Sequence, residues 1–310
     1  MTDKTRPRGA LAAVLTPFTD ALEPHHAVLI AHCRWLLAHG CTGLAVLATA
    51  GEANSLSLDQ RLKIVAALAA AGIPMEKVIV GGGSCALAEA VAMTKAIVAA
   101  GAGGALILPP FFYRDPDEEG LYAFYAALID RVGDPRLRIY LHHRPQASGA
   151  PITGGLVGRL TTGYGAVIAG VQNGAGDWPT TQALLTAFPD LDVFSGTERF
   201  LLENLRAGGP GCIAATLNVT APLVTAILAD PGSTDAETAQ QALAAVRLVF
   251  DRFPIPQGPK EILARLTSDP GWLRVLPPLC RLDEAARATL IKDLETLPQM
   301  RAITTAARDA

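Results

Sequence analysis

Histidine and arginine side chains that could do chemistry gather at the end of one short apolar run. The run "RIYL" is followed by His142, His143 and Arg144. An imidazole can act as a general acid or base near neutral pH, and a guanidinium can pair with a carboxylate. If the run is a strand, adjacent side chains face opposite sides of it, so only one histidine can point into a site. No carboxylate cluster accompanies the pair, so we expect no metal.

Two amides, Gln172 and Asn173, stand at the end of the next apolar run, in the segment "GVQNGAG". An amide neither titrates near neutral pH nor makes a competent nucleophile. The nitrogen of a primary amide has no basic lone pair, so it cannot condense with a ketone to form an iminium ion. We therefore expect Gln172 to hydrogen-bond a carbonyl or hydroxyl group of a ligand.

The loop "ATAGE", residues 48–52, offers a different kind of contact. Thr49 supplies a hydroxyl group, and the small residues Ala50 and Gly51 let backbone N–H groups approach an anion such as a carboxylate. An ordinary turn would explain the same residues. The later segment "GGGS", residues 81–84, lacks the lysine of a phosphate-binding loop, which favours close backbone packing.

Two further segments carry candidate residues. "PPFFYRD" places Tyr113 and Arg114 after another apolar run, and "FSGTERF" places Thr197 after a later one. Tyr113 is a candidate for proton transfer, and Thr197 is a candidate for binding a substrate. Either Arg114 or Arg144 would pair with a ligand carboxylate.

A repeated unit positions all of these residues. Between residue 11 and about residue 230, a short apolar run, a loop and an amphipathic helix recur eight times. Continuous apolar runs are typical of strands buried on both faces. Eight such units predict an α/β fold, a (β/α)8 TIM barrel over residues 1–230, with its active site at the carboxyl ends of the strands. Only helical patterns follow, so residues 231–310 are predicted to pack on the barrel as C-terminal helices.

Composition narrows the classes of partner and compartment. A net charge of -3 gives no electrostatic case for nucleic acid or an anionic membrane. The five cysteines show no CxxC spacing and most of them lie in apolar segments, which indicates small buried side chains in a reducing compartment. The first ten residues lack the apolar segment of a signal peptide, and glycine and proline interrupt the two long uncharged runs. We predict a cytoplasmic protein without a membrane segment.

In their order and spacing, these motifs resemble the dihydrodipicolinate synthase/N-acetylneuraminate lyase family of pyruvate-type class I aldolases. The resemblance covers about residues 9–300 and rests on "GALAAVLTPFTD", "ATAGEANSLSLDQR", "GGGS", "PPFFYRDPDEEGLYAFY", "GVQNGAGD", "FSGTERF" and "GCIAATLNVTAP". It implies a TIM barrel that binds a small 2-oxo acid or sugar acid, needs no cofactor, and assembles as a homotetramer or homodimer.

The chain departs from the family at the residues that carry the chemistry. The family's Schiff-base lysine ends the sixth strand, and here that position is Gln172. His142 takes the place of a proton-relay tyrosine on the fifth strand, and Ala50 replaces the second threonine of Gly-Thr-Thr-Gly-Glu. Phe112 stands at the position of another relay tyrosine, with Tyr113 one residue along.

None of the six lysines is expected at the mouth of the barrel. They are placed in the N-terminal tail, in outer helices, at the start of a strand and at the start of a late helix: Lys4, Lys63, Lys95, Lys292, Lys77 and Lys260.

Three interpretations of the function remain open. The first is a lyase or hydratase that works without a lysine Schiff base, with His142 facing the barrel interior and turnover dependent on pH near 6.5. The second is a non-catalytic family member that binds a small carboxylate or a partner. The third is an ordinary Schiff-base aldolase whose lysine lies elsewhere in the chain.

Overall fold

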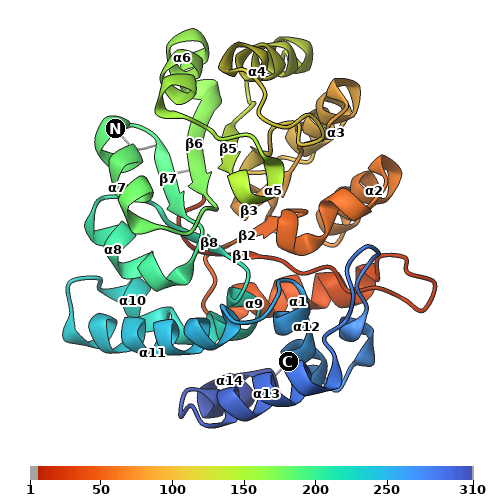
Figure 1. Cartoon of the computed structure of the whole chain (residues 1–310), viewed down its shortest axis with the longest axis vertical. Coiled ribbons are helices and arrows are strands. Elements are labelled where there is room, and N and C mark those ends of the chain that lie inside the picture. Colours follow the sequence, from red (N-terminus) through yellow and green to blue (C-terminus); the bar gives the residue numbers. More distant parts are fainter. Residues whose placement is uncertain (1–5, 309–310) are drawn as a thin grey trace.

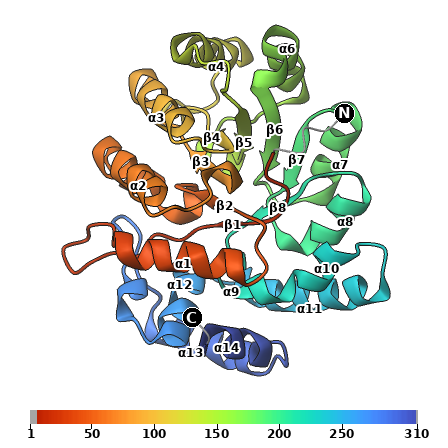
Figure 2. The ribbon, with the colours of Figure 1, turned by 180° about the vertical axis from the view of Figure 1, so that it is seen from behind.

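The computed structural model describes residues 6–308. Eight parallel strands close into a barrel in chain order, and β8 returns to pair with β1 (Figures 1 and 2). The strands are β1 (Gly9–Ala13), β2 (Gly43–Val46), β3 (Val78–Gly81), β4 (Gly104–Ile107), β5 (Ile139–His143), β6 (Ile168–Asn173), β7 (Asp192–Ser195) and β8 (Gly211–Ala214). The predicted TIM barrel is confirmed.

Helices surround the barrel and continue beyond it. Those within the repeat are α1 (His26–Ala38), α2 (Leu58–Ala70), α3 (Leu87–Ala99), α4 (Glu118–Val132), α5 (Pro145–Ser148), α6 (Gly154–Tyr164), α7 (Trp178–Ala187), α8 (Leu201–Arg206), α9 (Leu217–Thr220) and α10 (Thr225–Ala229). The C-terminal helices are α11 (Thr234–Phe250), α12 (Gln257–Thr267), α13 (Glu284–Glu295) and α14 (Met300–Arg308). The domain boundary near residue 230 stays a prediction.

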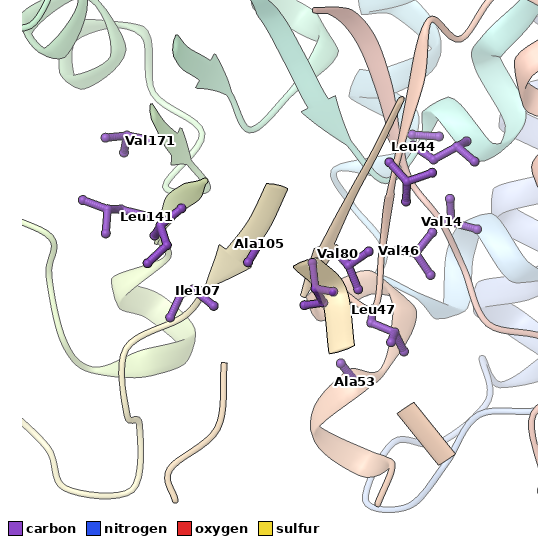
Figure 3. Close-up of a cluster of buried hydrophobic side chains, with 14 of the residues drawn as sticks. Val14, Leu44, Val46, Leu47, Ala53, Val80, Ala105, Ile107, Leu141 and Val171 are labelled. Atoms are coloured by element: carbon purple, nitrogen blue, oxygen red, sulfur yellow. The ribbon is translucent and has the colours of Figure 1, made fainter. Parts of the chain in front are cut away.

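Side-chain alternation along the strands builds two apolar layers. In β5, Tyr140 belongs to the cluster inside the barrel, whereas Leu141 belongs to the layer between strands and helices. Figure 3 shows part of that outer layer, with Val46, Val80 and Ile107 on neighbouring strands. Because β5 alternates in this way, the residue after Leu141 must face inward again.

Local sequence accounts for some helix boundaries and not for others. Ser57 starts α2 through a capping box, in which it accepts a hydrogen bond from the Gln60 backbone while the Gln60 side chain accepts one in return. Residues 221–229 form a short 3₁₀ turn, η6 (Ala221–Leu223), followed by α10, and not one continuous helix. Pro222 lies in the first turn of η6.

The C-terminal helices lie along one side of the barrel, next to α1 and α9 (Figures 1 and 2). Helix α11 also packs on α8 and α10, which brings it to the rim of the barrel. Among residues 6–308, no helix is both long enough and apolar enough to span a bilayer.

Candidate active site

A cavity of about 310 Å³ opens at the carboxyl ends of the strands. In TIM barrels this end carries the chemistry. The loops after β2, β5, β6, β7 and β8 form its walls together with α11. The polar and small side chains discussed below that line it are Thr49, Ala50, His142, Arg144, Gln146, Gln172, Thr197, Arg199, Arg247 and Asp251.

His142 and Gln172 lie side by side on the cavity wall. They are register partners on β5 and β6, and each is 5% exposed. Tyr140 and Leu141 precede His142 with the alternation described above, so the imidazole faces inward, as predicted. His143 faces outward, and its Nδ1 accepts a hydrogen bond from the Ile152 backbone at 3.0 Å. The structure therefore brings one histidine, not two, into the cavity.

The environment of His142 differs from the one assumed in the sequence analysis. Burial lowers the pKa of its imidazole to about 3, and the charge of Arg144 contributes in the same direction. The side chain is therefore neutral at physiological pH. The expected pH dependence near 6.5 rested on an unperturbed imidazole, and this burial removes its basis.

Gln172 has one satisfied end and one free end. Its Nε2 donates to the Ile213 carbonyl at 3.4 Å, while its Oε1 is buried without a hydrogen-bond partner among the described residues. Asn173 points the other way, and its Nδ2 donates to Thr181 at 2.9 Å and to the Asp177 carbonyl at 3.1 Å. The first amide belongs to the cavity and the second holds the loop that follows β6.

Arg144 brings an uncompensated guanidinium to the cavity. Its Nε is buried, and no hydrogen bond or ion pair joins its side chain to any residue within 6–308. Burial lowers the pKa of Arg144, and the nearby charge of Arg247 adds to that effect. A buried donor without a partner is costly, so this group is suited to receive an anion.

Two arginines and two carboxylates form a closed network at the rim, which the sequence analysis missed. Arg247 of α11 pairs with Glu198 at 3.1 Å and with Asp251 at 2.7 Å, and Arg199 pairs with Asp251 at 3.4 Å. Thr216 donates to the fully buried Glu198. Burial works to lower the pKa of Arg247, but these carboxylates outweigh it and raise the pKa. Only the four-residue spacing of Arg247 and Asp251 on one helix signalled a pair.

The loop after β2 has a constrained backbone, and a hydrogen bond from Thr16 fixes it on the side away from the cavity. Leu47 and Glu52 both adopt left-handed backbone conformations, with φ of 58° each, on either side of the short 3₁₀ turn η1 (Thr49–Gly51). Such conformations are strained for residues other than glycine and cluster at functional sites. Thr16 donates to the Gly51 carbonyl at 2.7 Å. Thr49 and Ala50 line the cavity, whereas Gly51 is buried beneath them.

Tyr113 and Arg114, two candidate site residues from the sequence, do not line the cavity. Tyr113 is 76% exposed and pairs edge-on with Phe112, itself 74% exposed, at 5.2 Å between ring centroids. Arg114 is also exposed and packs near Gly149. None of the three lines the cavity, so of the two arginines left open by the sequence, only Arg144 reaches it. Thr197 does line it and caps the 3₁₀ turn η5 (Glu198–Phe200).

Nearly all of the chain matches the model of one family. The profile of the dihydrodipicolinate synthetase family matches residues 6–297. The chain belongs to this family. It is 31% identical over 284 residues to an uncharacterized DapA-like lyase of Chloroflexus aurantiacus, covering 91% of this chain and 94% of that protein. It is 30% identical to a 4-hydroxy-tetrahydrodipicolinate synthase of a Synechococcus species, with 93% and 95% covered.

Solved structures agree with this assignment. The dihydrodipicolinate synthase of Agrobacterium tumefaciens superposes with a TM-score of 0.86 at 26% identity, covering 94% of this chain and 99% of that one. YagE, a prophage protein of E. coli K12 from the dihydrodipicolinic acid synthase family, was solved in complex with pyruvate. It superposes with a TM-score of 0.84 at 24% identity, covering 94% and 98%.

Among residues 6–308, no lysine lines the cavity of this dihydrodipicolinate synthetase family member. Within the described residues, Lys63, Lys77, Lys95 and Lys292 are exposed. Lys260 lies in the first turn of α12, where it is buried and forms an ion pair with Glu52 behind the β2 loop. Lys4 lies outside the described residues.

The "GGGS" segment of this family member packs as the sequence analysis expected. A Cβ atom on Gly81 would lie 1.7 Å from the Leu47 carbonyl oxygen, so only glycine fits there. The Arg61 guanidinium donates to the carbonyls of Gly81 and Gly83 at 3.2 and 3.0 Å. These contacts fix the floor below the β2 loop. Among residues 6–308 no group of three potential metal-ligating side chains occurs.

Proposed function

We propose that the barrel mouth binds a small hydroxylated 2-oxo acid or sugar acid and acts on it as a lyase or hydratase without a lysine Schiff base. The observation that carries the proposal is the guanidinium of Arg144, which is half-buried, has no partner among the described residues and lines the cavity with Gln172 and His142. Arginine binds carboxylates through paired, charge-assisted hydrogen bonds. Thr49 and the backbone around Ala50 offer further donors for the same ligand.

The charges around the cavity favour a ligand with one negative charge. Arg199 and Arg247 are balanced by Asp251 and Glu198, which bond to them directly. Arg144 is left as the cation without a counterion in the described part of the chain. A monocarboxylate would neutralise it, whereas a second carboxylate would approach Asp251 without a free cation to meet it.

The free end of Gln172 favours a hydroxyl group on the ligand. Its Nε2 faces the Ile213 carbonyl, and turning the amide over would place two acceptor oxygens together. The Oε1 atom therefore stays an acceptor that needs a donor. A ligand hydroxyl supplies one, and a sugar acid carries several.

Neutral His142 is the group available for proton transfer. A bound carboxylate would offset the charge of Arg144, which depresses the pKa of His142, and so would make the imidazole a better base. In a dehydration, His142 would take the proton from the carbon next to the carbonyl group. The imidazolium would then return it to the neighbouring hydroxyl, which leaves as water.

The second candidate is a binding protein without turnover. It is favoured by the pKa of His142, about 3, because a weak base is an inefficient catalyst at neutral pH. In this case Arg144, Gln172 and Thr49 would still hold the acid. The two candidates differ only in whether the bound acid is converted.

Calorimetry and a turnover assay test the proposal together. The probes are pyruvate, D-gluconate as a hydroxylated monocarboxylate, and 2-oxoglutarate as a dicarboxylate. Gluconate is expected to bind most tightly and 2-oxoglutarate least tightly. Release of a 2-oxo acid from sugar acids identifies the enzyme, binding without release identifies the binding protein, and no binding of any probe refutes both.

Self-association in the family supplies a role for the exposed aromatic pair. We infer that the chain forms a homodimer or homotetramer in which Phe112 and Tyr113 are covered. Two large aromatic side chains more than 70% exposed are unusual on a surface that faces only water. Sedimentation at micromolar concentration tests this inference, and a species of only 32 kDa would refute it.

A further inference from the structure

A second and larger cavity lies outside the barrel. It measures about 570 Å³ and shares no lining residue with the cavity at the barrel mouth. It lies between α1 on one side and α12, α14 and the 3₁₀ turn η7 (Pro270–Leu273) on the other. In Figure 2, α12 is labelled next to α1, and α14 lies below them. Its walls are mainly apolar, and four aromatic rings, those of His32, Trp35, His39 and Trp272, line it.

The rings are ordered by the spacing of α1. His32, Trp35 and His39 are three and four residues apart, which places them on one face of the helix. The Trp35 ring is stacked with His32 at 5.9 Å and with His39 at 4.8 Å between centroids. Trp272 meets the His32 ring edge-on at 4.9 Å. Aromatic rings prefer such stacked and edge-on contacts, and this wall can offer more of them to a planar guest.

The Nδ1 atom of His32 is fixed as a hydrogen-bond acceptor by the contacts of Asn218. The Asn218 Nδ2 donates to the carbonyls of Ala13 and Ala215 at 2.8 and 2.7 Å, which fixes the orientation of the amide. The Asn218 Oδ1 therefore accepts, from the Leu15 backbone at 3.1 Å and from the His32 Nε2 at 2.9 Å. The proton of neutral His32 must then lie on Nε2, which leaves Nδ1 with a free lone pair.

His32 keeps that form across the physiological range. It is 7% exposed, and burial lowers its pKa to about 4 despite the hydrogen bond to Asn218. No hydrogen bond within the described residues uses its Nδ1. The wall thus combines aromatic surface with the Nδ1 of His32 as an acceptor, and the Asp269 carboxylate lines the same cavity.

We propose that this cavity is a binding site for a planar aromatic molecule that carries one N–H or O–H donor, such as an indole or a phenol. The ring of the guest packs against Trp35, and its donor bonds to the Nδ1 of His32. A cavity of this size holds a bicyclic ring. The proposal does not depend on the function of the barrel mouth, because the two cavities share no residue.

Fluorine NMR with 5-fluoroindole as the probe tests the site. The wild-type protein is expected to broaden or shift the probe resonance in a saturable way. Ala31→Trp fills the cavity from an exposed position on α1 and is expected to weaken binding at least about tenfold. The matched control is Ala66→Trp, exposed on α2 and lining neither cavity, which should bind like wild type. Ala38→Trp, also on the lining, repeats the test if Ala31→Trp fails to fold.

A second probe tests the donor. 1-Methyl-5-fluoroindole keeps the ring but lacks the N–H group, and its affinity should be about 5- to 10-fold lower because a neutral hydrogen bond is lost. No saturable signal with 5-fluoroindole, or equal binding to wild type and both filled variants, would overturn the site. Equal affinity for the two probes would overturn the role of His32.

Discussion

Lys260 and Glu52, 208 residues apart in the chain, form a buried ion pair that joins α12 to the loop after β2. The Lys260 Nζ also donates to the Arg274 carbonyl at 2.7 Å and lies 4.4 Å from the Phe18 ring centroid. The second oxygen of Glu52 accepts from the Leu276 backbone at 2.8 Å. Burial lowers the pKa of Lys260 to about 8 against the opposing effect of Glu52. The pair fixes the loop that carries Thr49 to the C-terminal region.

Removing one partner of this pair is expected to destabilise the protein strongly. Lys260→Met leaves Glu52 as a buried, uncompensated charge, which costs about 3–5 kcal/mol in the free energy of unfolding. The double variant Lys260→Met/Glu52→Gln should recover much of that loss. Urea denaturation measures both, with the exposed Lys292→Met as the control. Equal stability of the single variant and wild type would show that the pair is not needed.

Borohydride trapping with pyruvate is expected to leave the intact mass unchanged. Gln172 cannot form an iminium ion, and Lys260 is engaged by Glu52 and the Arg274 carbonyl. Gln172→Lys is the positive control, because it places an amine on the cavity wall. An adduct mapped to any lysine of the wild-type chain would revive the ordinary Schiff-base aldolase.

Arg144 should contribute more to ligand affinity than Thr49. Arg144→Ala removes a charge-assisted hydrogen bond worth about 1.5–3 kcal/mol, so the Kd for the tightest-binding acid should rise about 10- to 150-fold. Thr49→Val removes a neutral hydrogen bond and should raise it less than about tenfold. Calorimetry compares both with Arg114→Ala, which changes an exposed arginine off the cavity. A larger effect from Arg114→Ala would place the carboxylate elsewhere.

If the protein turns over an acid, His142 should carry the proton. His142→Phe is expected to lower turnover about 10²- to 10⁴-fold, whereas His143→Phe should change stability more than rate. The pKa of His142 is about 3, so kcat/KM should stay level from about pH 5.5 to 8 rather than change near 6.5. A pH–rate profile with an inflection near 6.5 that disappears in His142→Phe would contradict the buried, neutral imidazole.

Acid should destabilise the fold through the same buried imidazoles. The pKa values of His32 and His142 are lowered to about 4 and 3, chiefly by burial. Below pH 6.5 the unfolded chain takes up protons at these residues and the folded chain does not, so stability is lost as the pH falls toward the folded values. By pH 4.5 each histidine lowers the free energy of unfolding by about 2–3 kcal/mol.

Urea denaturation at pH 7 and pH 4.5 measures this loss. His142→Phe should show a drop between the two pH values that is smaller than that of wild type by about 2–3 kcal/mol. Carboxylates titrate equally in both proteins, so the difference isolates His142. The same drop in both proteins would mean that the imidazole is hydrated and titrates normally in the folded state.

The sequence by itself determined the barrel and the direction in which strand residues point. Eight repeats of apolar run and helix allow few other closed arrangements, and strand alternation has a period of two. His142 and Gln172 were therefore expected to face inward, and the structure has them as register partners on the cavity wall. The glycines near Gly81 likewise predicted close backbone packing, because a side chain at Gly81 would collide with the Leu47 carbonyl oxygen.

The tertiary structure alone decided which distant groups meet at the mouth. The four-residue spacing of Arg247, in the last turn of α11, and Asp251, which follows that helix, predicts that the two lie close together, but not that they lie over the rim of the barrel. The sequence placed Lys260 at the start of a late helix but gave no sign of its partner, which stands 208 residues earlier in the chain. Burial of His142 and the free guanidinium of Arg144 depend on every element around them. Burial, charge pairing and the resulting pKa shifts arise from contacts between segments far apart in sequence. A local sequence pattern therefore cannot predict them.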